Sequence, residues 1–102
     1  MGFIIIYITY PNLKTAKKIV ASLMESRLIA CGNFFPVNSV YWWNGKIENS
    51  KEIVSIVKTK KENWEKVKSA VIKLHPYETP CIIKIDVKMN DDYESWINKE
   101  VR

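Results

Sequence analysis

The sequence is short of the residues on which several common functional sites depend. It has one histidine, two cysteines and three glycines among 102 residues. Three glycines leave no glycine-rich phosphate loop, and the two cysteines form no CxxC pair. The single histidine supplies one of the three or four ligands that a held zinc ion needs. A phosphate-loop enzyme and a classical zinc module are therefore excluded.

Long apolar runs are also missing. The N-terminal stretch MGFIIIYITY is of strand length, and it lacks the basic start and cleavage site of a signal peptide. No other segment is long enough to cross a membrane. We therefore expect a cytoplasmic protein without a membrane partner. In that reducing compartment Cys31 and Cys81 are expected to be free thiols.

The charge pattern gives little support to nucleic-acid binding. The net charge is +5, but the lysines are spread along the chain, with one dense run at residues 58–61. The aromatic cluster Tyr41, Trp42 and Trp43 lacks the pattern of an RNA-binding sheet, and no basic residues interleave with it. We expect the lysines to form solvated faces and the tryptophans to pack in a core or an interface.

The first half of the chain predicts a strand, a helix and a hairpin. Residues 3–10 are almost wholly apolar and β-branched, which is typical of a central strand. Asn12 is a helix cap, followed by an apolar stripe from Leu13 to Leu28. Asn44-Gly45 predicts a type I′ turn between strands over residues 33–43 and 46–58. Gly32-Asn33 reads as an irregular point, and Pro36 indicates an edge strand or a bulge.

The second half predicts a helix, a strand and a terminal helix. Thr59 and Glu62 have the spacing of a capping box for a helix that Pro76 ends. A strand over residues 80–87 and a helix over residues 90–101 follow. The resulting order is βαββαβ with an extra C-terminal helix. This is an α+β, ferredoxin-like fold in a single domain over residues 1–102.

The hairpin strands are too long for the rest of this sheet, which needs about eight residues per strand. Their overhang carries Trp42 and Trp43. An exposed apolar edge of this kind invites pairing, and a second copy of the chain is the simplest partner. The strand lengths thus predict an oligomer without fixing the number of subunits.

Four segments together resemble the CutA divalent-cation-tolerance family. They are ESRLIACGN (25–33), YWWNGKIENSKEIVSIVKT (41–59), LHPYETPCII (74–83) and YESWI (93–97). The resemblance covers essentially the whole chain. It implies a homotrimer of ferredoxin-like subunits whose hairpins meet, a role in divalent metal ion tolerance, and architectural kinship with the PII signalling proteins. It also implies binding of copper or another divalent cation. We expect no enzymatic activity, because the residues show neither a phosphate loop nor a paired-carboxylate pattern.

One departure from the family pattern bears on copper. Copper-binding members of the family carry a cysteine at the end of the first strand and a second histidine before the HPY motif. Here the matching positions hold Ile8 and Leu74, and only His75 is kept. We therefore expect weak binding of copper or zinc.

Four interpretations of the segment LHPYETPC, residues 74–81, are considered. His75 and Cys31 are candidate metal ligands, completed by a neighbouring subunit's Glu48 or Glu52. His75 could instead be structural: at a helix end its cationic form suits the helix dipole, and its ring can bond a free carbonyl. A catalytic pair of His75 with a cysteine lacks a third, orienting group.

The fourth interpretation is a cleft between subunits. Tyr77 and Glu78 would then face Trp42, Lys46 or Lys58 of another chain, with Trp43 at the same interface. In the related PII architecture such clefts bind small anionic effectors. The alternative function is therefore a PII-like ligand sensor or a trimeric scaffold.

Overall fold

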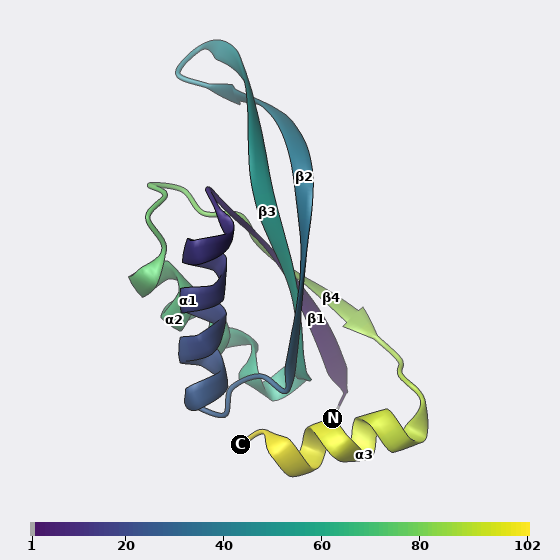
Figure 1. Ribbon diagram of the computed structural model, residues 1–102. Coiled ribbons are helices and arrows are strands. Elements are labelled where there is room, and N and C mark those ends of the chain that lie inside the picture. Colours follow the sequence, from purple (N-terminus) through teal and green to yellow (C-terminus); the bar gives the residue numbers. More distant parts are fainter. Residues whose placement is uncertain (1) are drawn as a thin grey trace.

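The computed structural model describes residues 2–102 and has the predicted order of elements, with a short 3-10 helix added (Figure 1). The helices are α1, α2 and α3, the 3-10 helix is η1, and the strands are β1 to β4. Their bounds in chain order are β1 Phe3–Tyr10, α1 Leu13–Glu25, β2 Cys31–Trp43, β3 Lys46–Lys60, η1 Lys61–Asn63, α2 Trp64–Leu74, β4 Ile82–Val87 and α3 Asp91–Glu100.

The four strands form one antiparallel sheet in the order β2-β3-β1-β4. β1 is central, as its apolar composition predicted: Phe3 is paired with Lys60 of β3 and with Val87 of β4. β2 is an edge strand and carries Pro36, which confirms the expectation from proline's missing N–H. The α+β, ferredoxin-like fold is thereby confirmed.

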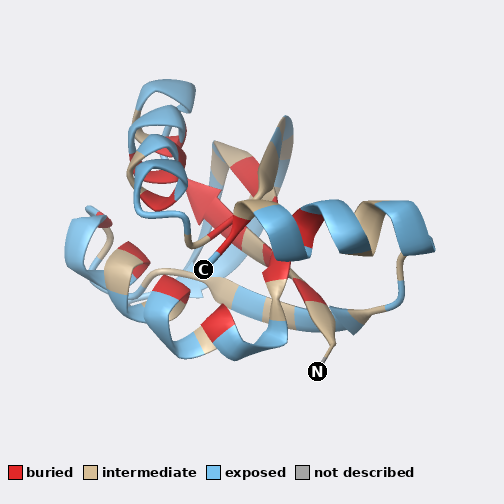
Figure 2. Cartoon of the chain, turned by 90° about the horizontal axis from the view of Figure 1, so that it is seen from below, coloured by how far each residue is buried: buried red, intermediate tan, exposed pale blue. Residues whose placement is uncertain are grey.

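The core lies between one face of the sheet and the helices α1 and α2. Alternate residues of β1 point to this face and are completely buried: Ile4, Ile6, Ile8 and Tyr10. The apolar stripes of the two helices cover them, as the buried colouring in Figure 2 shows. The main helical contributors to this core are Ala16, Ile19, Val20, Leu23, Val67 and Val71.

Helix α1 begins as predicted and ends earlier than its apolar stripe. The Asn12 side chain accepts a hydrogen bond from the Thr15 backbone N–H at 2.8 Å. The helix stops at Glu25 because Arg27 has a φ of 59°. The N–H groups of Arg27 and Leu28 then bond back to the last turn, which is the Schellman arrangement. Leu28 therefore packs against the core from the loop.

The capping box predicted for Thr59 and Glu62 is wrong. Thr59 lies within β3, is completely buried, and donates its hydroxyl to the Leu28 carbonyl at 2.6 Å. Asn63 donates to the same carbonyl at 3.1 Å. The Thr59 hydroxyl therefore makes a tertiary hydrogen bond and does not cap the helix.

The hairpin is the longest feature of the molecule and projects beyond the rest of the sheet (Figure 1). Asn44 and Gly45 have φ angles of 51° and 77°, which confirms positive φ at both turn positions. β1 ends opposite Ile53, so the hairpin beyond that register has no further strand beside it. The irregular point expected at Gly32-Asn33 is absent, because β2 runs through both residues. Gly32 lies inside the strand, opposite Val57.

Candidate functional site

His75 lies where α2 gives way to the extended segment before β4. It is the residue that follows the last helical turn, and its backbone is extended because Pro76 comes next. The pairing of β1 with β4 ends at Ile8, and the His75 ring reaches the next carbonyl of β1. Its Nε2 is 2.7 Å from the Thr9 carbonyl oxygen.

The hydrogen bonds of His75 define the protonation of its ring. The Tyr77 backbone N–H donates to Nδ1 at 3.1 Å, so Nδ1 carries no proton. Nε2 must then carry the proton and donate it to Thr9. The predicted bond from the ring to a backbone carbonyl is present. The ring is 8% exposed and stacks on Tyr10 with centroids 5.4 Å apart.

His75 and Cys31 do not form a metal site within one chain. Cys31 is the first residue of β2 and lies level with Ile5 of β1, because both pair with Lys58 of β3. His75 instead contacts the carbonyl oxygen of Thr9, four residues further along β1. Four strand residues alone separate the two positions by about 13 Å. Among residues 2–102 no group of three or more His, Cys, Asp or Glu side chains is placed to hold a metal ion.

Cys31 instead belongs to a small cluster at the other end of the sheet. Burial and the neighbouring Cys31 sulfur raise the pKa of Tyr93 to about 12. The Lys58 ammonium lies over the Tyr93 ring, 5.5 Å from its centroid. Lys58 is thus held against α3, far from the residues with which the sequence grouped it.

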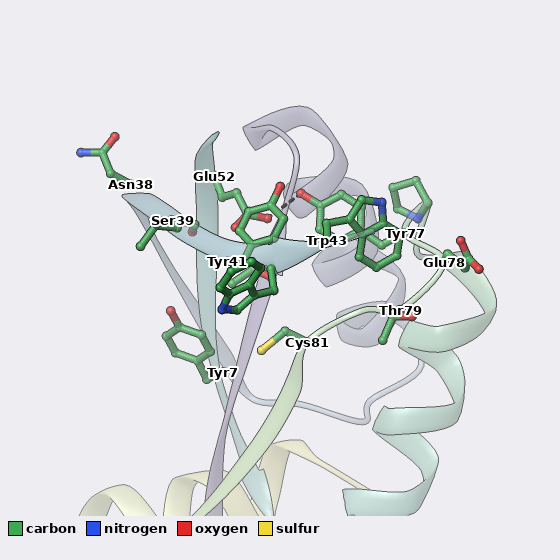
Figure 3. A pocket seen from close by; sticks show the side chains of 14 residues that line it. Tyr7, Asn38, Ser39, Tyr41, Trp43, Glu52, Tyr77, Glu78, Thr79 and Cys81 are labelled. Atoms are coloured by element: carbon green, nitrogen blue, oxygen red, sulfur yellow. Dashed lines mark hydrogen bonds between the residues drawn. The ribbon is translucent and has the colours of Figure 1, made fainter. Parts of the chain in front are cut away.

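A cleft of about 930 Å³ opens between the outer part of β2, residues 38–43 of the projecting hairpin, and the segment that joins α2 to β4 (Figure 3). Trp42, Trp43, Tyr77 and Glu78 line it, and Lys58 does not. The other residues that line it are Tyr7, Thr9, Asn38, Ser39, Val40, Tyr41, Glu52, Pro76, Thr79 and Cys81. Tyr77, Glu78, Trp42 and Trp43 thus line a cleft of a single chain, while the cleft predicted between subunits stays a prediction.

Glu52 interacts with two other polar side chains of this cleft, Tyr77 and Cys81. Its carboxylate accepts a hydrogen bond from the Tyr77 hydroxyl at 2.6 Å, the dashed line in Figure 3. Burial, and then the hydrogen bond to Glu52 and its charge, raise the pKa of Tyr77 well above its usual range. Burial and the charge of Glu52 likewise raise the pKa of the Cys81 thiol. The phenol and the thiol are therefore neutral at pH 7.

The sign of the charge in the cleft is opposite to that of the whole chain. The protein has 16 lysines and arginines and a net charge of +5. No lysine or arginine is among the 14 described residues that line the cleft, whereas Glu52 and Glu78 are. The sequence could not show this, because Tyr7 and Glu52 reach the cleft only through the strand register.

The sheet order, the overlong hairpin and the cleft beside its outer part define a ferredoxin-like domain with a long β2–β3 hairpin. A sequence profile described as "CutA1 divalent ion tolerance protein" matches residues 4–100. The chain therefore belongs to the CutA1 divalent ion tolerance family.

Individual relatives agree along nearly the whole chain. The divalent-cation tolerance protein CutA of Pyrococcus horikoshii is 45% identical over 100 residues, which cover 97% of this chain and 98% of the relative. The crystal structure of CutA1 from Pyrococcus horikoshii superposes with a TM-score of 0.94 at 44% identity, covering 97% of this chain and 98% of that chain. The structure described as the periplasmic divalent cation tolerance protein CutA from Archaeoglobus fulgidus gives a TM-score of 0.96 at 40% identity, covering 98% of this chain and 99% of that chain.

The two positions that depart from the copper-binding pattern are hydrocarbon side chains in different surroundings. Ile8 is completely buried in the core beneath α1 and α2, and Leu74 is 44% exposed at the end of α2. Neither side chain has an atom that binds a metal. The remaining residue of the pattern, His75, has both ring nitrogens in hydrogen bonds.

Proposed function

We propose that this protein contributes to tolerance of divalent metal ions by binding them reversibly in a homotrimer, without catalysing a reaction. The observation that carries the proposal is the family match over residues 4–100, together with relatives named for divalent-cation tolerance. Copper and zinc are the ions we expect. Their binding should be weak, because His75 is the only histidine and its ring is already engaged.

The side chains argue against catalysis. A nucleophilic cysteine needs a base within reach and a thiol that ionises readily. The Nδ1 and Nε2 atoms of His75 bond to the backbone, which leaves no free nitrogen to act as a base. The raised pKa of Cys81 makes its thiol less reactive than an ordinary one. A binding function fits these groups better than a cysteine–histidine mechanism.

The homotrimer is supported by apolar surface that one chain leaves uncovered. On the hairpin, Trp42 is 72% exposed and Ile47 is 58% exposed. On the sheet face opposite α1 and α2, Ile83 and Ile85 are nearly half exposed. A soluble monomer would rarely leave so much apolar surface in water. Sedimentation equilibrium at low micromolar concentration should give three times the chain mass, and a monomer mass would contradict the proposal.

Metal binding in such a trimer would use ligands from more than one subunit. The Cys31 thiol and surface carboxylates are the groups that remain, and copper(I) in particular prefers thiolate. Part of the proposal is a cytoplasmic location, which keeps Cys31 reduced. Across residues 2–102 the structure has no helix long and apolar enough to span a membrane. The Archaeoglobus fulgidus relative is described as periplasmic, so cell fractionation should decide the compartment.

Growth under metal stress tests the proposal directly. Cells that lack their own CutA would carry this chain or an empty vector, at graded copper and zinc concentrations. We expect growth at higher metal concentration only when the chain is present. Equal growth in both cultures would refute the role in tolerance.

A second candidate function is favoured by the cleft. An opening of about 930 Å³ with several aromatic walls and two carboxylates is of the size that small-molecule sites have. We propose that it binds a small ligand, which would make the protein a sensor or a ligand-responsive scaffold. This function and metal tolerance are compatible.

A further inference from the structure

We propose that the cleft selects an organic cation: a protonated aliphatic amine or diamine. This inference rests on the second proposed function, that the cleft binds a small ligand, and it names the class of that ligand. It reverses the anionic effector that the architectural analogy implied. The reason is that the cleft has two carboxylates and, among its described lining residues, no lysine or arginine.

The aromatic rings supply the first part of the recognition. Tyr7 of β1, Tyr41 and Trp43 of β2, and Tyr77 of the segment before β4 all line the cleft, and Figure 3 shows their rings around one opening. The faces of such rings attract ammonium groups through their quadrupoles, and tryptophan does so most strongly. They also cover the methylene groups of an aliphatic chain. A ligand that is both cationic and aliphatic uses both properties.

The carboxylates supply the second part. Glu52 has four lone-pair sites, and the Tyr77 hydroxyl occupies one of them. The others can accept the N–H groups of an ammonium ion in a charge-assisted hydrogen bond. Glu78 lies on the other wall, in the segment that joins α2 to β4, and it offers a second carboxylate to a diamine.

The same features disfavour the two other classes of ligand. An anion would meet Glu52 and Glu78 without a compensating lysine or arginine in the wall. An inorganic dication needs several oxygen, nitrogen or sulfur ligands that converge on one point. Among the described residues no group of three or more His, Cys, Asp or Glu side chains does so. An organic ammonium ion needs no converging ligand set, because a few acceptors and ring faces suffice.

Isothermal titration calorimetry with matched ligands tests the proposal. Putrescine is the diamine probe, 1,4-butanediol is its neutral counterpart of similar length, and citrate is the anionic probe. We expect putrescine to bind at least about tenfold more tightly than butanediol, because the diol lacks the charge. Citrate should not bind in the cleft.

Two pairs of variants connect the binding to this cleft. Glu52→Gln keeps an acceptor for the Tyr77 hydroxyl but removes the charge, and we expect it to weaken putrescine about tenfold or more. Glu65→Gln makes the same chemical change on the exposed face of α2 and should have no effect. Tyr41→Phe keeps the ring face and should bind putrescine normally, whereas Tyr41→Leu should weaken it severalfold.

The outcomes separate this inference from the function on which it rests. Citrate binding that Glu52→Gln strengthens would show a ligand cleft of the opposite charge class, and it would overturn the cation proposal alone. Equal binding of putrescine and butanediol would do the same. If none of the three probes binds, for example because a neighbouring subunit fills the cleft, both the inference and the ligand-binding function are refuted.

Discussion

Replacing His75 with alanine should destabilise the fold. The change leaves the Thr9 carbonyl without its 2.7 Å donor in a buried position and removes the ring that stacks on Tyr10. An orphaned buried acceptor costs about 1–3 kcal/mol and a lost aromatic pair about 0.5–1.5 kcal/mol. The expected loss is therefore about 2–4 kcal/mol in the free energy of unfolding.

Two conservative variants show which hydrogen bond matters. In His75→Gln the side-chain amide can reach the Nε2 position and donate to Thr9. In His75→Asn the amide oxygen can take the Nδ1 position and accept from the Tyr77 N–H. Because the bond to Thr9 is the more deeply buried, we expect stability to fall in the order wild type, Gln, Asn, Ala.

Thermal unfolding followed by circular dichroism measures this series. A loss of 1 kcal/mol lowers the midpoint of a domain of this size by about 4 °C, so His75→Ala should lose roughly 10 °C. The measurement is made with a chelator present, so that metal plays no part. Midpoints equal to the wild type in all three variants would refute the structural role of His75.

Three further changes test the turn, the sheet and the cleft. Gly45→Val should lower the free energy of unfolding by about 1–2 kcal/mol, because Gly45 has a φ of 77°; an added Cβ meets nothing within 4 Å, so no clash contributes. Gly45→Asn should cost less, and urea unfolding measures both variants. Gly32→Ala should cost about 1–3 kcal/mol, because its Cβ would lie 2.9 Å from a Val20 methyl, and adding Val20→Ala should restore part of that loss; no rescue in the double variant would contradict the clash. Glu52→Gln should lower the raised pKa of Cys81, so the thiol should react severalfold faster with a disulfide reagent at pH 8, and an unchanged rate would remove Glu52 as a cause.

The fold could be predicted wherever a local signal determined the structure. The β-branched run of β1, the Asn12 cap and the Asn44-Gly45 turn each act within a few residues, and each was predicted correctly. The capping box failed because Thr59 bonds to a residue 31 positions away. That contact depends on how α1 is connected to β2, so the residues around Thr59 could not predict it.

The candidate site was harder to predict because strand register decides which side chains meet. Within one chain the register puts Lys58 opposite Cys31 and against Tyr93 of α3, while its place in a cleft between subunits stays a prediction. The same register brings Glu52 to the cleft, where it bonds Tyr77 from 25 residues away. A shift of one residue in β3 would turn Glu52 to the opposite face of the sheet and away from the cleft, since alternate side chains point to opposite faces.

Titration of the chain with zinc and copper(II) under reducing conditions tests the central claim of weak, reversible binding without a histidine-centred site. Wild type and Cys31→Ala are compared with His75→Gln, which is expected to stay folded. The account predicts dissociation constants of about 1 μM or weaker for the wild type, which corresponds to about 8 kcal/mol or less of binding free energy. His75→Gln should bind like the wild type, because the ring nitrogens of His75 are already engaged. Nanomolar binding that His75→Gln abolishes would contradict the account.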